Sequence, residues 1–293
     1  MKIVFVGCVD FSASALRELI ALKASVVGVC TTGRSDFNAD YADLSVIAKD
    51  AGIPLYLTGD VNDPACIEWV RSLAPDVVFC FGWSRLLKRP FLSIARLGVV
   101  GYHPSKLPMN RGRHPIVWAL ALNLEETGSS FFFMDEGADT GDILSQKSVP
   151  IYRSDDASSL YRRITDQALS QIRELLPVLA DGTYTRTAQP RGSGSYWRKR
   201  GAADGQIDWR MSADAIYDLV RALATPYVGA HFLVRGTAVK VWKTEVVPCR
   251  ANNIEPGKVI AAEDGVFTVK AGVDAVKLCV IEPEIELEVG SYL

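Results

Sequence analysis

The first half of the chain alternates short apolar runs with stretches in which apolar residues recur every three or four positions. The short runs predict buried strands, and the recurring pattern predicts amphipathic helices. The expected strands cover residues 2–6, 26–31, 54–57, 76–81 and 98–102. The expected helices cover residues 12–22, 44–51, 63–73 and 84–94. Strands that alternate with helices of this length indicate an α/β fold with a Rossmann-like, mostly parallel sheet.

The pattern changes in the second half of the chain. A short helix is expected near His114, and the later elements are two strands that flank an acidic loop and a long helix, at 127–134, 143–150 and 155–179. One more helix precedes five short β runs, at 213–224, 231–235, 238–248, 257–261, 265–271 and 277–288. These short runs predict a small β-barrel-like domain. Because residues 181–205 are rich in Gly, Ser, Pro and Arg, we expect a first domain over 1–190, a linker over 191–205 and a C-terminal domain over 206–293.

Composition adds few constraints. Hydrophobic residues make up 48% of the chain, which is enough for a sizeable core, and the net charge of −2 gives no overall attraction to nucleic acid or an anionic membrane. The six cysteines form no C-x-x-C pair and have no histidine at metal-ligand spacing, so we expect reduced thiols and no metal site. No apolar run reaches membrane-spanning length, and the run at 2–6 is too short for a signal peptide. We therefore expect a cytoplasmic protein without a membrane partner.

Candidate chemistry lies in two loops. The stretch 101-GYHPSKLPMNRG-112 carries His103 directly before a proline, which favours an extended histidine where a strand ends. The stretch 134-MDEGADTGD-142 is rich in glycine and acids. In an open α/β sheet ligands bind at the carboxyl ends of strands, so an imidazole and a carboxylate at one sheet edge would form an acid/base pair. Each stretch alone is more often an ordinary turn or loop than a site.

Taken together, the two stretches resemble the signature of the 10-formyltetrahydrofolate-dependent formyltransferases. That family has N-x-H-x-S-L-L-P-x-x-R-G, followed by D-T-G-D about thirty-six residues after the histidine, and here His103 and Asp139 are 36 residues apart. The resemblance continues through 204-DGQIDW-209 and 221-RALATPYVGAHF-232 and covers nearly the whole chain. It implies the formyltransferase fold, 10-formyltetrahydrofolate as formyl donor and no metal. A departure that bears on the chemistry is Gly101, which stands where the family has its asparagine.

The resemblance also implies the catalytic roles. His103 would donate a hydrogen bond to the oxyanion of the tetrahedral intermediate, and Asp139 would orient the imidazole or accept a proton. Gly101 has no side chain that could supply the family's amide contact. A backbone group, a water molecule or Ser105 are the alternatives that the sequence leaves open.

The loop at 81–90 follows the third long strand, and the resemblance implies that it holds the pterin ring, largely through backbone groups. A flat ring needs a narrow apolar slot with a few amide groups at its edge. The predicted folate-binding residues are Phe81, Gly82, Trp83, Leu86, Asp135 and Asp139. Core packing is the alternative interpretation of Trp83.

The predicted contacts with the second substrate come from three places. The loop 7-GCVDFS-12 has one glycine where a dinucleotide fingerprint needs three, so we interpret it either as a helix cap or as a phosphate contact. The run 196-YWRKR-200 is either part of a solvated linker or a clamp on a diphosphate. The predicted sugar-nucleotide-binding residues are Cys8, Val9, Asp10, Phe11, Ser12, Arg111, Arg113, Tyr196, Trp197, Arg198 and Arg200.

Three functions are weighed. The first is formyl transfer to a nucleotide-linked amino (dideoxy) sugar for the biosynthesis of a bacterial surface glycan such as lipopolysaccharide. The second is methionyl-tRNA formyltransferase, which is disfavoured because residues 206–293 hold nine Lys and Arg against twelve Asp and Glu, and the loop 33–43 holds one Arg against three Asp. The third is a folate or nucleotide-sugar binding protein without activity. The sugar, the nucleotide and the oligomeric state stay open, with a homodimer as one alternative.

Overall fold

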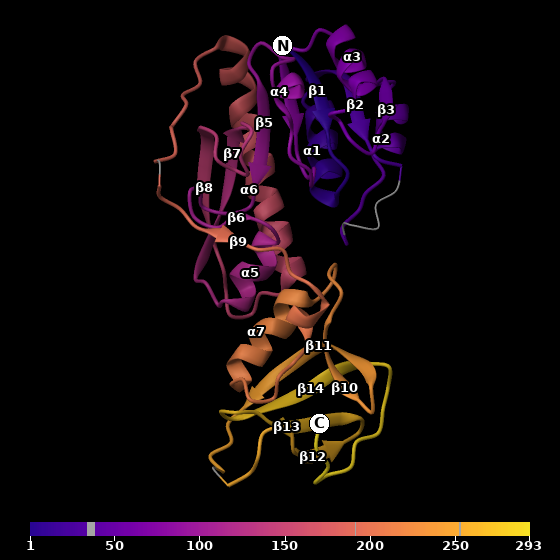
Figure 1. The fold of residues 1–293 in the computed structure, drawn as a ribbon, viewed down its shortest axis with the longest axis vertical. Helices are drawn as coiled ribbons and strands as arrows, with labels where there is room; N and C mark the ends of the chain where they lie inside the picture. The colour runs from indigo at the N-terminus through magenta and orange to yellow at the C-terminus, as the bar shows by residue number, and fades with distance from the viewer. Residues whose placement is uncertain (34–38, 191, 252) are drawn as a thin grey trace. The chain divides into compact units, whose positions relative to one another are not determined.

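The computed structural model describes residues 1–33, 39–190, 192–251 and 253–293, so part of the loop at 33–43 lies outside the described residues (Figure 1). The chain forms two compact units. The first consists of Met1–Pro115, Thr127–Val149 and Arg162–Trp197, and the second of Ile116–Glu126, Pro150–Tyr161 and Arg198–Leu293. The units interleave along the chain, because two short segments before residue 162 group with the C-terminal part.

The first unit is built on a seven-stranded sheet in the order β3-β2-β1-β4-β5-β7-β8 (Figure 1). In that order the strands are Leu55–Leu57, Ser25–Thr31, Lys2–Val6, Val77–Cys80, Val99–His103, Glu126–Phe133 and Ile143–Pro150. The pairs from β3 to β5 are parallel, and β7 runs antiparallel to β5. The predicted Rossmann-like, mostly parallel sheet is confirmed.

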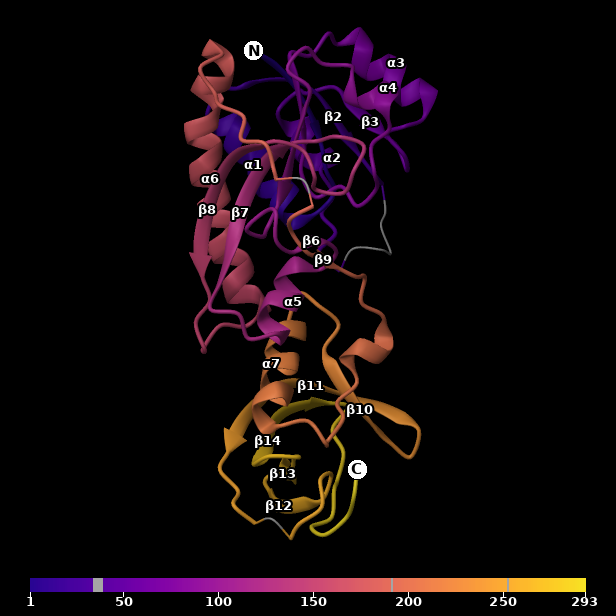
Figure 2. The same ribbon diagram turned by 60° about the vertical axis from the view of Figure 1, so that its left-hand side comes forward.

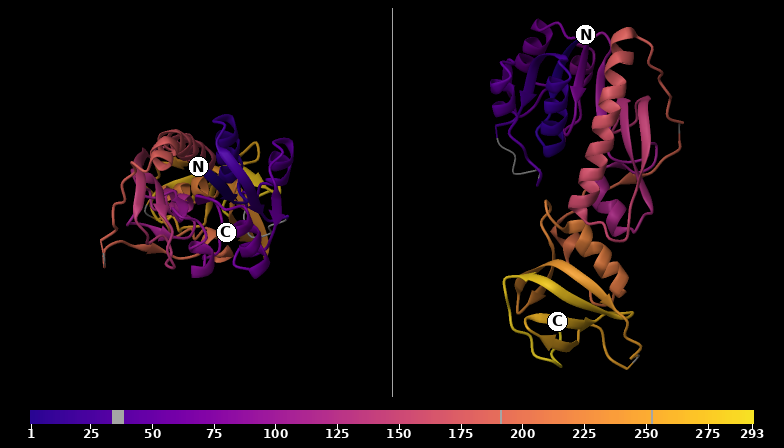
Figure 3. Two further views of the ribbon diagram at one scale, coloured as in Figure 1. Left: turned by 90° about the horizontal axis from the view of Figure 1, so that it is seen from above. Right: turned by 180° about the vertical axis from the view of Figure 1, so that it is seen from behind.

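Helices cover both faces of this sheet, because the buried strands carry apolar side chains on both sides. One face packs against α3 (Pro64–Ser72) and α4 (Arg89–Leu92), through alternate strand residues such as Val4 and Val78. The other face carries α1 (Asp10–Ala21) and α6 (Ala157–Asp181), which Arg173 and Glu18 join by an ion pair of 2.7 Å (Figure 2). A further short helix, α2 (Ser45–Asp50), precedes β3. The view from behind shows α6 in front of the sheet (Figure 3).

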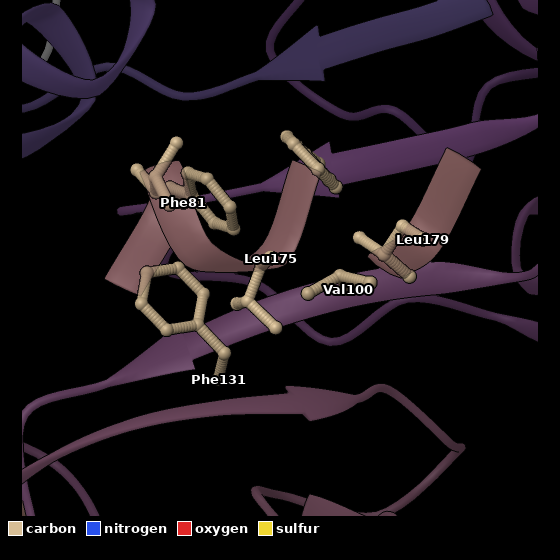
Figure 4. A pocket seen from close by; sticks show the side chains of 7 residues that line it. Phe81, Val100, Phe131, Leu175 and Leu179 are labelled. Carbon is tan, nitrogen blue, oxygen red and sulfur yellow. The ribbon is translucent and has the colours of Figure 1, made fainter. Parts of the chain in front are cut away.

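The space between α6 and the sheet is part of the core. Figure 4 shows Phe81, Val100 and Phe131 from the sheet side facing Leu175 and Leu179 of α6. All of these side chains are apolar and buried. The candidate chemistry therefore lies elsewhere, at the ends of the strands.

The predicted helix at 84–94 is wrong in its extent, since only Arg89–Leu92 is helical. The reason is tertiary. Asn62 donates a side-chain hydrogen bond to the carbonyl of Leu86 and accepts one from the amide of Lys88, at 3.0 and 2.7 Å. These two backbone groups bind Asn62 instead of forming helical hydrogen bonds. Residues 82–88 therefore form a loop after β4.

The second unit pairs one helix with an antiparallel sheet. Its sheet has the order β10-β11-β14-β13-β12, with strands Ala230–Val234, Thr237–Val247, Ala275–Glu282, Val266–Lys270 and Val259–Glu263. The helix α7 (Ala213–Leu223) begins at Ser212, whose hydroxyl accepts a hydrogen bond from the amide of Ala215. The predicted small C-terminal domain of one helix and five strands is present.

Buried Arg221 of α7 ties the early segments to this unit. Its guanidinium binds the carboxylate of Asp218 at 2.8 Å and the side chain of Asn123 at 3.0 Å. It also donates to the carbonyls of Tyr152 and Asp155. The helix α5 (Pro115–Ala121) leads into the segment that carries Asn123.

Most of the segment predicted as a linker is bound within one unit or the other. Tyr196–Trp197 form β9, which pairs in parallel with β6 (Arg111–Gly112) in the first unit. Ala202–Gly205 form a short 3₁₀ helix, η1, in the second unit. The division between the units therefore falls between Trp197 and Arg198. The described residues of this segment are largely exposed, as its composition predicts, and backbone pairing with β6 holds its first part in place.

Candidate active site

His103 is the last residue of β5, and its imidazole is buried with 5% of the residue exposed. Its Nε2 lies 2.8 Å from the carbonyl oxygen of Asn110. Because a carbonyl oxygen only accepts, Nε2 carries the hydrogen. The other ring nitrogen, Nδ1, faces Asp139 and lies 3.6 Å from its Oδ2. The imidazole is thus held in one tautomer with its second nitrogen directed at a carboxylate.

Asn110 has a left-handed backbone with φ of +63°, a region that asparagine tolerates better than most residues. Its amide donates to the hydroxyl of Ser195, and that hydroxyl donates back to the Asn110 side chain, at 2.9 and 3.1 Å. Ser195, which lies far from Asn110 in the sequence, therefore helps to position the Asn110 carbonyl that fixes the His103 tautomer.

Asp139 reaches His103 by a less direct route than the sequence indicated. Since β7 runs antiparallel to β5, with Ser130 opposite His103 and Phe133 opposite Val100, the acidic loop leaves β7 three residues away from the level of His103. The loop 134–142 then folds back to bring the carboxylate to the imidazole. Asp139 has φ of +57°, and its Oδ2 accepts a hydrogen bond of 2.9 Å from the amide of Gly112.

Arg111 holds this loop and lies inside the protein, with 6% of the residue exposed. Its guanidinium donates to the carbonyl of Asp139 and to the side chain of Gln189. It also donates to the hydroxyl of Tyr196 at 3.2 Å. Arg111 was predicted to bind the sugar nucleotide, but these contacts commit its donors to the protein, so the geometry argues against a phosphate contact.

Gly101 lies on the same face of β5 as His103, two residues earlier. A Cβ placed there would lie 2.7 Å from the Cγ of Met134 and 3.0 Å from its Sδ, and 3.0 Å from the Cζ of Phe132. The Met134 side chain therefore occupies the space that a side chain at position 101 would enter. This packing explains how the chain accommodates glycine at this position, and sequence reasoning missed it.

Ser105 is completely buried, and its hydroxyl donates to the carbonyl of Met109 at 3.0 Å. The predicted supporting role of Ser105 is therefore not favoured by the geometry, because its hydroxyl hydrogen is used inside the turn and the residue has no exposed surface.

The loop after β4 has one buried and three accessible members of the predicted folate set. Phe81 has 1% exposure, and its side chain packs in the core. Gly82 has φ of +70°, and a Cβ there would lie 2.2 Å from a methyl of Val9, so only glycine fits. Leu86 is 59% exposed. Trp83 is half-buried, and its indole Nε1 has no hydrogen-bond partner among the described residues.

Asp135 lies at the exposed tip of the acidic loop. Its Oδ1 accepts hydrogen bonds from the amide of Gly137 and the hydroxyl of Thr140, at 3.0 and 2.6 Å. These contacts shape the turn that precedes Asp139.

The predicted phosphate contact at residues 8–12 is not favoured by the local structure. Cys8, Val9, Phe11 and Ser12 are buried. At the beginning of α1 the amide of Val9 donates to the hydroxyl of Ser12, and the amide of Asp10 donates to the carbonyl of Asp40. Burial, and then the nearby Asp40 carboxylate, raise the pKa of Asp10. A helix N-terminus whose first amides are used and which carries two carboxylates is a poor site for an anion.

The remaining predicted substrate residues divide between the two units. In the first unit, half-buried Arg113 donates to the carbonyl of Ser84 in the loop after β4, at 2.8 Å. Burial lowers the pKa of the Arg113 guanidinium, and the nearby Asp139 carboxylate partly opposes this. The amide of Arg113 donates to the carbonyl of Trp197. Tyr196 is 59% exposed, with its hydroxyl on Arg111.

In the second unit, Arg198 and Arg200 lie over the ring of Trp118, at 5.3 and 4.5 Å from its centroid. Arg198 binds the Asp204 carboxylate, and Arg200 donates to the Asp204 carbonyl. These arginines stabilise the beginning of the second unit, which weakens the predicted diphosphate clamp.

Two further properties concern the described residues. Among them, no three His, Cys, Asp or Glu side chains are grouped so that they could hold a metal ion. In the same part of the chain, no helix combines the length and the apolar character that crossing a membrane requires.

The comparisons with known proteins agree with this architecture. The family model described as formyl transferase matches residues 1–176, and the model for its C-terminal domain matches residues 200–288. Together the two models match most of the chain. The chain belongs to the formyl transferase family.

Solved structures share the fold at low sequence identity. HypX from Aquifex aeolicus is similar over 96% of this chain, with a TM-score of 0.69 and 18% identity, and the match covers 45% of that chain. The chain thus spans less than half the length of HypX. WlaRD, a sugar 3N-formyl transferase solved with dTDP and 5-N-formyl-THF, is similar over 95% of this chain and 97% of its own, with a TM-score of 0.69 and 17% identity.

The N-formyltransferase from Helicobacter canadensis, in complex with folinic acid and dTDP-3-aminofucose, is similar over 95% of this chain and 98% of its own. Its TM-score is 0.73 and its identity 17%. At these identities the likeness supports the fold, and the ligands are those of the other proteins.

Proposed function

We propose that the protein transfers a formyl group from 10-formyltetrahydrofolate to the amino group of a nucleotide-linked amino sugar. The observation that carries the proposal is the pair formed by His103 and Asp139, with 3.6 Å between Nδ1 and Oδ2 at the end of β5. Family membership supplies the reaction class, and the fold is shared with enzymes whose structures contain formylated folates and dTDP or a dTDP-linked amino sugar.

The chemistry requires that a neutral amine attack the formyl carbon. A new carbon–nitrogen bond forms, the carbonyl becomes an oxyanion, and the bond to N10 of the folate then breaks. The attacking nitrogen loses one proton, and the released N10 gains one, so the step is balanced. General acid/base groups at hydrogen-bond reach speed both transfers.

His103 and Asp139 are suited to these steps. Since the Nε2 hydrogen is bound to the Asn110 carbonyl, Nδ1 is the nitrogen that exchanges a proton. Protonated at Nδ1, the imidazolium stabilises the oxyanion, and the Asp139 carboxylate stabilises the imidazolium. The same carboxylate keeps its orientation through the amide of Gly112.

The loop after β4 fits the donor. Trp83 lies in the same loop as the exposed Leu86, and its indole N–H has no partner in the part of the chain that the structure describes. A buried donor without a partner is costly, so it favours a ligand that brings an acceptor. The edge of a pterin ring offers nitrogen and oxygen acceptors, and its faces need apolar surface. We therefore assign the folate ring to residues 82–86.

The acceptor is proposed to be a sugar nucleotide rather than a charged tRNA. The C-terminal residues 206–293 carry more acids than bases, which disfavours a phosphate backbone. A formylated sugar nucleotide would serve a bacterial surface glycan, and the proposed compartment is the cytoplasm, where folates and sugar nucleotides are made.

The test is an assay of the purified protein with 10-formyltetrahydrofolate and a panel of nucleotide-linked 3-amino and 4-amino dideoxy sugars, with methionyl-tRNA in parallel. Transfer to a sugar, seen as tetrahydrofolate release and a mass gain of one formyl group, would support the proposal. Transfer to the charged tRNA alone would sink it. Binding of a formylated folate without any turnover would instead favour a non-catalytic binding protein.

A further inference from the structure

Gln189 lies between the acidic loop and Arg111. Its Oε1 accepts hydrogen bonds from Nε and a terminal nitrogen of Arg111, at 3.1 and 2.5 Å. Its Nε2 donates to the carbonyls of Asp139 and Gly141, at 2.9 and 2.7 Å. Arginine only donates and carbonyls only accept, so a neutral amide is the group that satisfies both sides at once. All four hydrogen-bonding positions of the side chain are used.

These contacts act on a loop that the backbone alone would not hold in place. The loop leaves β7 at the level of Val100 and must return toward His103. Asp139 adopts φ of +57°, which an L-residue takes up only at a cost in energy. The carbonyl of Asp139 is bound from two directions, by Gln189 and by Arg111. Its conformation is thus fixed by side chains that come from outside the loop.

We propose that Gln189 is a positioning residue for formyl transfer, holding loop 134–142 so that the Asp139 carboxylate lies beside His103. This inference rests on the proposed function, since it assigns Gln189 a role in that reaction. Gln189 donates a hydrogen bond to the backbone carbonyl of Asp139. Its effect on the reaction is therefore indirect, through the position of the Asp139 carboxylate. Arg111 works with it, because the buried guanidinium orients the Gln189 amide while binding the same carbonyl.

Gln189→Glu gives the sharpest variant, because it keeps the shape of the side chain and the acceptors for Arg111. It removes both donors, so the carbonyls of Asp139 and Gly141 lose a partner. We expect kcat to fall about 10- to 100-fold, as for a misplaced catalytic group, while KM for both substrates stays near the wild-type value. Gln189→Ala should lower kcat at least as far.

Gln171→Ala is the matched control. Gln171 is a glutamine of the same unit, buried where Gln189 is half-buried, and it donates to the carbonyl of Ser129 and the hydroxyl of Ser145. Its loss should lower the melting temperature without lowering kcat at a temperature where the protein stays folded. A wild-type kcat in Gln189→Glu would overturn the proposal. So would a rise in KM at constant kcat.

A second readout does not depend on activity. Hydrogen exchange followed by mass spectrometry should show faster exchange in peptides covering 134–142 in Gln189→Glu, with β1 and β4 unchanged. If the wild-type protein transfers no formyl group to any acceptor, the proposed function fails, and exchange still decides whether Gln189 anchors the loop. Unchanged exchange over 134–142 would overturn the anchoring role in either case. Should Gln189→Ala fail to fold, Gln189→Glu alone carries the test.

Discussion

At the scale of single residues, the site depends on how each nitrogen of one imidazole is used. The carbonyl of Asn110 takes the Nε2 hydrogen of His103, which leaves Nδ1 to face Asp139. A histidine with a free ring could present either nitrogen to a substrate. In this protein the tautomer is fixed by the fold, so proton exchange is confined to the side that faces the carboxylate.

Replacing His103 by alanine is expected to lower kcat by about 100-fold or more, the usual effect of losing one oxyanion donor. Asp139→Asn keeps the shape, tolerates the φ of +57° and leaves an acceptor for the Gly112 amide, but it removes the charge. We expect it to lower kcat more than it raises KM. Steady-state kinetics at one temperature below unfolding measure both effects.

His114→Asn is the control for these variants. His114 has φ of +56°, which asparagine accepts, and it matches no catalytic position of the resemblance. Its kcat should stay close to that of the wild type. Near-native turnover in His103→Ala would show that the proposed roles of His103 and Asp139 are wrong, even with the donor and fold correct.

Gly101 and Met134 give a second residue-scale prediction. Gly101→Asn places a Cβ 2.7 Å from the Met134 Cγ, so the single variant should lose about 1–3 kcal/mol of stability through overpacking. Met134→Ala in the same chain should restore part of that loss. Denaturant unfolding of both single variants and the double variant gives the coupling between the two positions. Additive effects would contradict the contact between Gly101 and Met134.

At the scale of elements, the short strand β9 and the segment before it contribute residues that support the site. β9 pairs with β6, and the segment that leads to it brings Gln189 and Ser195 against the loops of Asp139 and Asn110. A strand of two residues has little stability of its own. Besides its pairing with β6, side-chain contacts hold it in place, in particular the hydrogen bond from Arg111 to the hydroxyl of Tyr196, which is a residue of β9.

The turn around η1 provides a prediction on pH. Hydrogen bonds from Arg198, and then from the amide of Gly201, hold the pKa of the Asp204 carboxyl well below its usual range. A carboxyl with a lowered folded-state pKa stabilises the fold above its unfolded value of about 3.9, and this stabilisation is lost as the pH falls further. Asp204→Asn should therefore be less stable at pH 7, by no more than about 1 kcal/mol because Arg198 is exposed. Urea midpoints of the two proteins should converge in acid, and a difference that persists there would contradict this assignment.

At the scale of the whole molecule, charge limits the choice of partner. The chain has a net charge of −2, and its C-terminal residues 206–293 have an excess of three acids. Binding to a nucleic acid backbone draws most of its affinity from phosphate contacts and is steeply dependent on salt. A protein with an excess of acidic residues attracts a phosphate backbone only weakly. A small sugar nucleotide, by contrast, needs only a few directed contacts.

Filter retention of a charged tRNA should therefore be weak at low salt and lack a steep dependence on salt concentration. In the same buffers, formyl transfer to a sugar nucleotide should change only modestly with salt. A steep salt dependence of tRNA retention would point instead to methionyl-tRNA formyltransferase.

The sequence alone determined the sheet, most of the helices and the pair of loops that carry His103 and Asp139. Periodicity of apolar residues is a local signal, so most strands of the two large sheets and α1, α3, α6 and α7 could be predicted to within a few residues. The two-residue strands β6 and β9 were not predicted. The motif spacing and its resemblance to a family indicated the reaction. The helix expected at 84–94 failed because Asn62, more than twenty residues earlier, takes over two backbone partners.

Tertiary structure decided which side chains are available at the site. The sequence suggests that Arg111 is a phosphate ligand, but the residue is buried and all three of its guanidinium nitrogens bind protein groups, Asp139 and Gln189 among them. No sequence pattern marks Gln189 as part of the site, because single glutamines are common in polar segments. Its role depends on contacts that form only in the folded protein. Likewise Met134 fills the space beside Gly101 only because β7 runs antiparallel to β5. Hydrogen bonds and close contacts between residues distant in sequence are set by the packed fold, and local patterns do not contain them.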